Sequence, residues 1–283
     1  MLIPAPVPDG PGPHWPTATL VLVLMCALGF GWTMALQRES RPAVDAAVER
    51  LEVAVAASPQ GRLSPVELDG LPDRWRLELS GVTDAAGPGD SAMSSAVIEL
   101  RQRVHEMPAW RFGWVPSTPT SYGWLSYIFV HTQWFHLLVN ILLLWLLGAT
   151  LERRCSSRLM VLCFLIAGVA GACVHGWLFS TSSVPLVGAS AAVAGVLGGL
   201  LVGAPSRHLA FALVVGRRSS QSSRDLMIPL GAILLTWCGL EWIAFLEANT
   251  APSALFAHLS GGLTGAVIAL VWRRSRVREP HGP

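Results

Sequence analysis

Six long apolar segments dominate the 283-residue chain. A helix needs about 20 predominantly apolar residues to cross the hydrocarbon core of a bilayer. Segments of that kind lie at 17–36, 132–151, 159–180, 186–204, 226–247 and 253–272. The composition agrees, because only 13% of the residues are charged, whereas about a quarter are charged in an ordinary soluble domain. The sequence therefore predicts an all-α polytopic membrane protein with six transmembrane helices.

Arginines mark one side of this predicted bundle. Basic residues in short loops accumulate on the cytoplasmic side of a membrane protein. Here they follow the second, fourth and sixth apolar segments, which all end on the same side of a six-span chain. These arginines are Arg153, Arg154, Arg158, Arg207, Arg217, Arg218, Arg224, Arg273, Arg274, Arg276 and Arg278. Both termini are therefore predicted to be cytoplasmic, and the long segment 37–128 is predicted to lie outside.

The outer segment is the part of the chain with soluble character. Residues 42–56 and 91–106 have the apolar periodicity of amphipathic helices. Residues 74–80 alternate like a short strand, and 85–90 contain the glycine and proline of a turn. No catalytic motif occurs there, so we expect a lid, a partner-binding element or a tether.

Charge and cysteine usage exclude several classes of protein. The formal net charge is only +2 and the chain has no lysine, so nothing indicates binding to nucleic acid. The cysteines lack the C-x-x-C spacing of zinc sites and lie in or beside apolar segments. They are Cys26, Cys155, Cys163, Cys173 and Cys238. Their positions therefore predict neither a zinc site nor a disulfide framework. The H-E-x-x-H string of a membrane metalloprotease is also absent from the sequence, so no metal is expected.

Polar residues inside the apolar segments converge on one depth of the predicted membrane. A helix rises 1.5 Å per residue, which places Ser190 about 6 Å and His258 about 8 Å below the outer face. His136 and Asn140 lie roughly 6–12 Å below it. Because polar groups in hydrocarbon are costly, residues that meet at one level from three helices are candidates for function.

The chemistry of these residues fits nucleophilic catalysis. Ser190 lies in the first turn of its helix, where free backbone N–H groups can stabilise a developing oxyanion. His258 can act as its base, and His136 and Asn140 share one helical face as oxyanion-hole candidates. Small residues on the two helices favour close backbone contact; they are Gly195, Gly198, Gly199, Gly261 and Gly265. Taken singly, a serine at a helix start is more often a cap, and a buried histidine more often a packing residue.

Together these motifs resemble those of the rhomboid family of intramembrane serine proteases. The resemblance extends over about 108–272 and follows the family order. It begins at Trp110-Arg111-Phe112-Gly113-Trp114-Val115-Pro116 and continues through His131-x4-His136-x3-Asn140, Gly148, Glu152-Arg153, Gly188-Ala189-Ser190 and Ala257-His258-x2-Gly261-x3-Gly265.

The resemblance implies a six-helix core that hydrolyses peptide bonds with a Ser–His dyad. It makes Ser190 the nucleophile that forms an acyl-enzyme and His258 the general base. The Ser190 N–H, His136 and Asn140 would hold the oxyanion, with Gly188, Gly261 and Gly265 in support. His131 resembles the family's structural histidine, and substrate gating is the alternative role for it. The substrates would be single-span membrane proteins, and no cofactor or metal is expected. The expected location is the bacterial cytoplasmic membrane, with the site facing outward.

The implied organisation has four parts. Residues 1–36 form an N-terminal tail and the first helix, 37–107 an extracytoplasmic insertion, 108–272 the catalytic core, and 273–283 an arginine-rich tail.

The chain departs from the family pattern close to the serine. Ala191 replaces the usual glycine after the serine, and Ala194 replaces an aromatic residue that stacks on the histidine in many members. Trp124-Leu125 stands where Trp-Arg is often found. The alternative is therefore a non-catalytic rhomboid-like protein that binds transmembrane segments for quality control or sorting.

Overall fold

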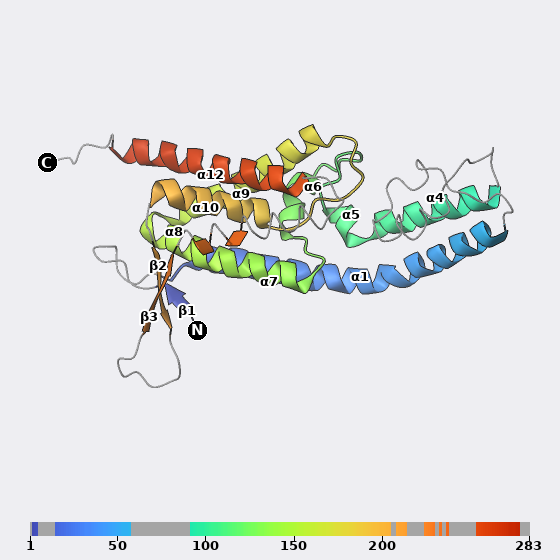
Figure 1. The fold of residues 1–283 in the computed structure, drawn as a ribbon, viewed down its shortest axis with the longest axis horizontal. Helices are drawn as coiled ribbons and strands as arrows, with labels where there is room; N and C mark the ends of the chain where they lie inside the picture. The colour runs from blue at the N-terminus through green and yellow to red at the C-terminus, as the bar shows by residue number, and fades with distance from the viewer. Residues whose placement is uncertain are drawn as a thin grey trace.

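The computed structural model describes residues 2–4, 15–57, 91–204, 208–213, 224–229, 232–233, 236–237 and 253–277. Its main body is a bundle of helices that run roughly along the long axis of the molecule (Figure 1). α12 (Ser253–Val277) packs against α9 (Ser157–Leu178) and α10 (Ser190–Gly203). On the other side of the bundle, α7 (Trp134–Leu143) lies along α1 (Thr17–Ala57).

Four helical stretches are long and apolar enough to cross a membrane. They are Thr17–Ala57, Trp134–Arg154, Ser157–Leu178 and Ala254–Arg276. Together with the shorter apolar helix α10, they correspond to five of the six predicted segments. The prediction of a helical integral membrane protein is therefore confirmed, and the count of six spanning helices stays a prediction.

The second of these stretches is not a uniform α-helix. After α7 the chain forms one π-helical turn, η2 (Leu144–Gly148), and then α8 (Ala149–Arg154). A π-helical turn inserts an extra residue into the helix and commonly occurs at functional sites. Three short helices connect the outer segment to α7; they are α5 (Pro108–Phe112), α6 (Gly123–Ser126) and η1 (Tyr127–Phe129).

An antiparallel pair of helices projects from one end of the bundle (Figure 1). The predicted amphipathic helix at 91–106 is present as α4 (Ser91–Glu106), and it packs along the second half of α1. Leu51 and Leu100 are fully buried in a small apolar core between the two helices. Arg50 donates two hydrogen bonds, of 2.9 and 2.7 Å, to the carboxylate of Glu99 across the pair.

The prediction of two separate helices at 17–36 and 42–56 is wrong, because both belong to the 41-residue α1. That helix is about 60 Å long, twice the thickness of a hydrocarbon core. Pro42 lies inside it, although proline removes one helical hydrogen bond. The packing against α4 begins two residues later at Val44 and accounts for the continuation of the helix.

A small antiparallel sheet departs from the all-α prediction. β2 (His208–Leu213) pairs with β1 (Leu2–Pro4) on one side and with β3 (Arg224–Pro229) on the other. Its register places His208 opposite Pro229 and Leu213 opposite Arg224. β3 therefore occupies the start of the predicted helix at 226–247, where no helix begins.

The sheet has a simple origin in the sequence. In β2, larger and smaller apolar residues alternate with the period of two that a strand requires. Of the predicted helix at 226–247, 232–233 and 236–237 are helical, and the remaining residues after β3 lie outside the described part of the chain. The predicted strand at 74–80 and turn at 85–90 also lie outside it.

Glu152, near the end of α8, forms hydrogen bonds with the first residues of α1. Its carboxylate accepts hydrogen bonds from the backbone N–H groups of Ala18 (3.0 Å) and Thr19 (2.8 Å). It also accepts from the hydroxyls of Thr19 (2.7 Å) and Ser157 (2.8 Å). A carboxylate is favourable at a helix N-terminus because it satisfies free N–H groups and the positive end of the helix dipole. This buried residue thus joins three helices at one end of the bundle.

Glycines bring α10 and α12 into backbone contact. A Cβ atom added to Gly265 would overlap the Gly195 carbonyl oxygen, and one added to Gly261 would overlap the Ala191 carbonyl oxygen. A Cβ on Gly198 would likewise overlap the carbonyl oxygen of Gly262. Close approach of this kind requires small residues on both helices. It fixes the relative position of the two helices that carry Ser190 and His258.

Candidate active site

Ser190 is the first residue of α10, directly after a tight turn. Gly188 in that turn has φ +107°, a backbone conformation that glycine adopts without strain. Its N–H donates to the Tyr127 carbonyl oxygen at 2.9 Å. Two residues earlier, Leu186 exchanges backbone hydrogen bonds of 2.8 and 3.0 Å with Trp114. The turn that presents the serine is therefore held by Tyr127 at the start of η1 and, two residues earlier, by Trp114.

His258 lies in the second turn of α12 and faces this serine. The Ser190 Oγ and His258 Nε2 atoms are 2.6 Å apart, a hydrogen-bond distance. Gly261, one turn further along α12, touches the backbone at Ala191 and so sets the spacing of the two helices. The predicted nucleophile and base are thus brought together.

Trp237 makes an edge-to-face contact with the His258 ring, with ring centroids 5.9 Å apart and an interplanar angle of 80°. Ala194, one turn after Ser190 on α10, has no aromatic ring to offer His258, and its small side chain is buried. The aromatic neighbour of His258 therefore comes from another segment. Sequence reasoning missed this contact, because a single tryptophan in an apolar segment carries no signal of its tertiary partner.

His136 lies beside the serine turn. A Cβ atom on Gly188 would come within 2.5 Å of the His136 Cε1 atom and 2.9 Å of Nε2, so the ring covers this glycine closely. Asn140, one turn later on α7, is buried and donates from Nδ2 to the His136 carbonyl oxygen at 2.9 Å. The structure therefore brings His136 to the serine turn, while the Asn140 amide is bonded within its own helix.

His131 contacts the same turn through the backbone of Ala189. It is completely buried, and its Nε2 lies 3.4 Å from the backbone N of Ala189, which donates to it. Its ring is 5.3 Å from that of His136. Burial, together with the nearby His136, lowers the pKa of His131 to about 4. The neutral ring can accept the Ala189 N–H at neutral pH, which fits a structural role.

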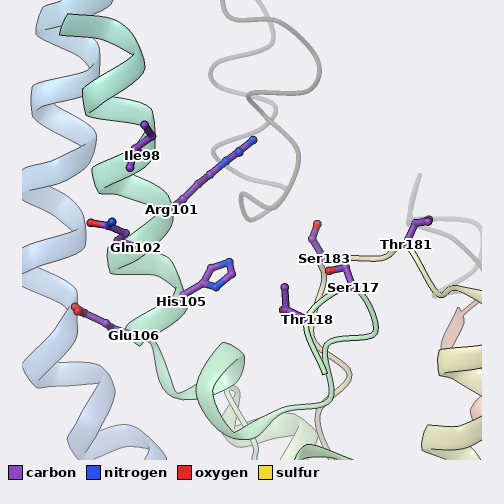
Figure 2. A pocket seen from close by; sticks show the side chains of 9 residues that line it. All are labelled: Ile98, Arg101, Gln102, His105, Glu106, Ser117, Thr118, Thr181 and Ser183. Atoms are coloured by element: carbon purple, nitrogen blue, oxygen red, sulfur yellow. The ribbon is translucent and has the colours of Figure 1, made fainter. Parts of the chain in front are cut away.

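Figure 2 shows a pocket that is lined by other residues than the candidate site. It has a volume of about 600 Å³ and lies between α4 and two loops, with none of the predicted site residues in its lining. Ser117 and Ser183 contribute hydroxyls from the loops, and His105 points in from α4. Ser117 donates its N–H to Ser182 at 3.0 Å, in the same loop pair that continues to Trp114 and Leu186. The pocket therefore borders the loops that support the serine turn.

The arrangement is chemically suited to acyl transfer. A neutral imidazole can accept the Ser190 proton, and backbone N–H groups at the start of α10 have no partners within the helix. Within the described residues, no group of three or more His, Cys, Asp or Glu side chains is placed to hold a metal ion.

Comparison with known proteins gives consistent matches to one family. A family model described as the Rhomboid domain matches residues 118–275. The rhomboid protease GlpG of Serratia proteamaculans is 28% identical over 158 residues, which cover 55% of this chain and 50% of that protein. The rhomboid protease GluP of Bacillus subtilis is 37% identical over 92 residues, covering 32% of this chain and 18% of that protein. The chain thus spans half or less of the length of these relatives.

Proposed function

Because the chain belongs to the rhomboid family, we propose that it is a serine endopeptidase that cleaves single-span membrane proteins in or near the bilayer. The observation that carries the proposal is the 2.6 Å separation of Ser190 Oγ and His258 Nε2. In this proposal both termini are cytoplasmic, and Ser190 opens towards the outer side of the membrane.

The reaction begins with transfer of the Ser190 hydroxyl proton to His258 Nε2. The Oγ atom then attacks the scissile carbonyl carbon and forms a tetrahedral oxyanion. His258 gives the proton to the leaving amine, the C–N bond breaks, and an acyl-enzyme remains on Ser190. A water molecule, deprotonated by His258, then releases the new carboxylate and restores the serine hydroxyl.

The oxyanion would be held by the Ser190 N–H and by His136, which lies at the serine turn. Asn140 Nδ2 uses one of its two N–H groups for the His136 carbonyl oxygen, so the other N–H is the one that would donate to the oxyanion. Donors aimed at the developing charge are each worth about 10²–10³ in rate. We therefore expect His136, whose ring covers Gly188 of the serine turn, and Asn140 each to contribute on that scale.

The alternative function is non-catalytic binding of transmembrane segments. It is favoured by the two departures from the family pattern on the serine helix, Ala191 and Ala194. The two functions differ in one property, the reactivity of the Ser190 hydroxyl.

Labelling with a fluorescent fluorophosphonate tests that reactivity without knowledge of the substrate. We expect folded, detergent-purified wild-type protein to react at one serine, and Ser190→Ala to abolish the label. Thermal unfolding of the same samples controls for folding. Folded wild-type protein that stays unlabelled would favour the non-catalytic alternative.

Trp237 should set the orientation of His258. An edge-to-face aromatic contact is worth about 0.5–1.5 kcal/mol, so Trp237→Ala is expected to slow labelling about two- to tenfold. Trp237→Phe keeps a ring and should retain most of the rate. The control is Trp177→Ala, because Trp177 is 79% exposed on α9. If Trp237→Ala labels at the wild-type rate, Trp237 does not position His258.

A further inference from the structure

Arginines from two helices gather at the end of the bundle opposite Ser190. Arg154 ends α8, and Arg273 and Arg276 lie in the last turns of α12. Cys155 directly follows Arg154 in the chain. Burial raises the pKa of its thiol to about 11, and the positive charges of Arg276, Arg154 and Arg273 oppose that rise.

The packing of the helix ends also places Arg154, Arg273 and Arg276 near Cys155. The Cys155 Sγ atom lies 3.5 Å from the position that a Cβ on Gly203 would take, at the end of α10. Arg273 donates from Nη1 to the carbonyl oxygen of Val202 at 3.0 Å. The Arg276 guanidinium lies 4.6 Å from the centre of the Trp272 ring. The ends of α8, α10 and α12 therefore meet around Cys155.

These positive charges have no carboxylate partner among the residues that the structure describes. The ion pairs found there lie in the projecting helix pair and its surroundings, such as Arg50–Glu99 and Arg103–Glu106. Glu152, two positions before Arg154, directs its carboxylate to α1 and Ser157. Within the described part of the chain, no carboxylate therefore balances the charge of the arginine cluster.

The cluster lies at the depth of a membrane surface. From His258 to Arg273 and Arg276, α12 rises about 22 and 27 Å, and a hydrocarbon core is about 30 Å thick. If His258 lies just below one face, the arginines reach the headgroup region of the other. Trp272 beside them has the amphipathic ring that is enriched at such interfaces.

We propose that Arg154, Arg273 and Arg276 form a binding site for the phosphate of an anionic phospholipid headgroup. A guanidinium presents paired N–H donors that match phosphate oxygens, and basic pockets between transmembrane helices bind such headgroups. The excess of arginines on the cytoplasmic side of a membrane protein depends only on how many arginines its loops contain. It does not explain why arginines of two different helices lie close together. A headgroup held here bridges α8 and α12, and its binding does not depend on catalysis by Ser190.

The test compares two double variants that remove the same charge from the same end. Arg154→Gln with Arg276→Gln disrupts the cluster, whereas Arg158→Gln with Arg274→Gln removes two exposed arginines that do not act on Cys155. The full chain in detergent is titrated with phosphatidylglycerol, and bound lipid is counted by native mass spectrometry. We expect the cluster variant to bind phosphatidylglycerol at least about tenfold more weakly, and the control to bind like wild type.

Two further arms identify the ligand. Phosphatidylcholine should bind weakly and equally to all three proteins, because it carries no net charge. Inorganic phosphate should not displace the bound phosphatidylglycerol at equal concentration if the site takes a lipid headgroup; displacement would mean that it takes free phosphate. Equal loss of phosphatidylglycerol in both double variants would overturn the proposal in favour of general charge attraction.

Discussion

Replacing His258 by glutamine is expected to slow fluorophosphonate labelling of Ser190 by about 10²–10⁴-fold, the usual contribution of a general base. His258 Nε2 lies 2.6 Å from the Ser190 Oγ atom, and a neutral imidazole can take up the hydroxyl proton as the bond to phosphorus forms. A glutamine amide has a similar length and can still hydrogen-bond, but it cannot accept that proton. The loss therefore reports base catalysis rather than a change of packing.

A matched control removes a histidine that is not among the candidate site residues. His105 is exposed on α4 and contacts neither Ser190 nor His258 in the described hydrogen bonds, so His105→Gln should label at the wild-type rate. The thermal unfolding temperatures of both variants should stay close to that of the wild type. Normal labelling of folded His258→Gln would mean that Ser190 does not use this histidine.

The elements that the sequence predicts well are those with a local cause. The apolar stretch of α9 and the amphipathic pattern of α4 are visible in their own residues, because each helix buries a face at a 3.6-residue period. Glu152-Arg153 was found as a motif, but not the bonds from Glu152 to Ala18 and Thr19. Those bonds join residues far apart in the chain, and no periodicity reports them.

The wrong predictions have tertiary causes. Pro42 reads as the end of a helix, yet α1 continues because Val44 and Leu51 pack against α4. Strand β2 was overlooked because a short alternating run beside arginines also fits a loop, and only pairing with β1 and β3 makes it a strand.

The features of the candidate site also separate into those with a local cause, which the sequence predicts, and those that depend on tertiary packing. Counting depth along two helices was sufficient to predict that Ser190 and His258 lie at one level, because helical rise is constant. The bond from Asn140 to the His136 carbonyl oxygen also has a local cause, since residues four apart on a helix are neighbours. The contact of Trp237 with His258 depends on how two separate segments pack, which a single sequence does not specify.

Gly265→Val is expected to destabilise the bundle and to abolish labelling together. A Cβ atom at this position would overlap the carbonyl oxygen of Gly195, so α10 and α12 have to move apart. Overpacking of a tight core usually costs about 1–3 kcal/mol, and here the opposing atom is backbone, which cannot change rotamer. Separation of the helices lengthens the distance between Ser190 Oγ and His258 Nε2 and removes the base from the nucleophile. The measurements are the thermal unfolding temperature and the labelling rate.

Gly262→Ala provides the control on the same helix. The only neighbour of an added Cβ there within 4 Å is the Ala194 carbonyl oxygen, at 3.7 Å, an ordinary van der Waals contact. This variant should therefore unfold and label like the wild type, although it also places a methyl group on α12 near α10. If Gly265→Val behaved in the same way, the backbone contact between Gly265 and Gly195 would not hold the serine and the histidine together. The contrast between two glycines three residues apart thus separates a specific contact from a general requirement for small residues on this helix.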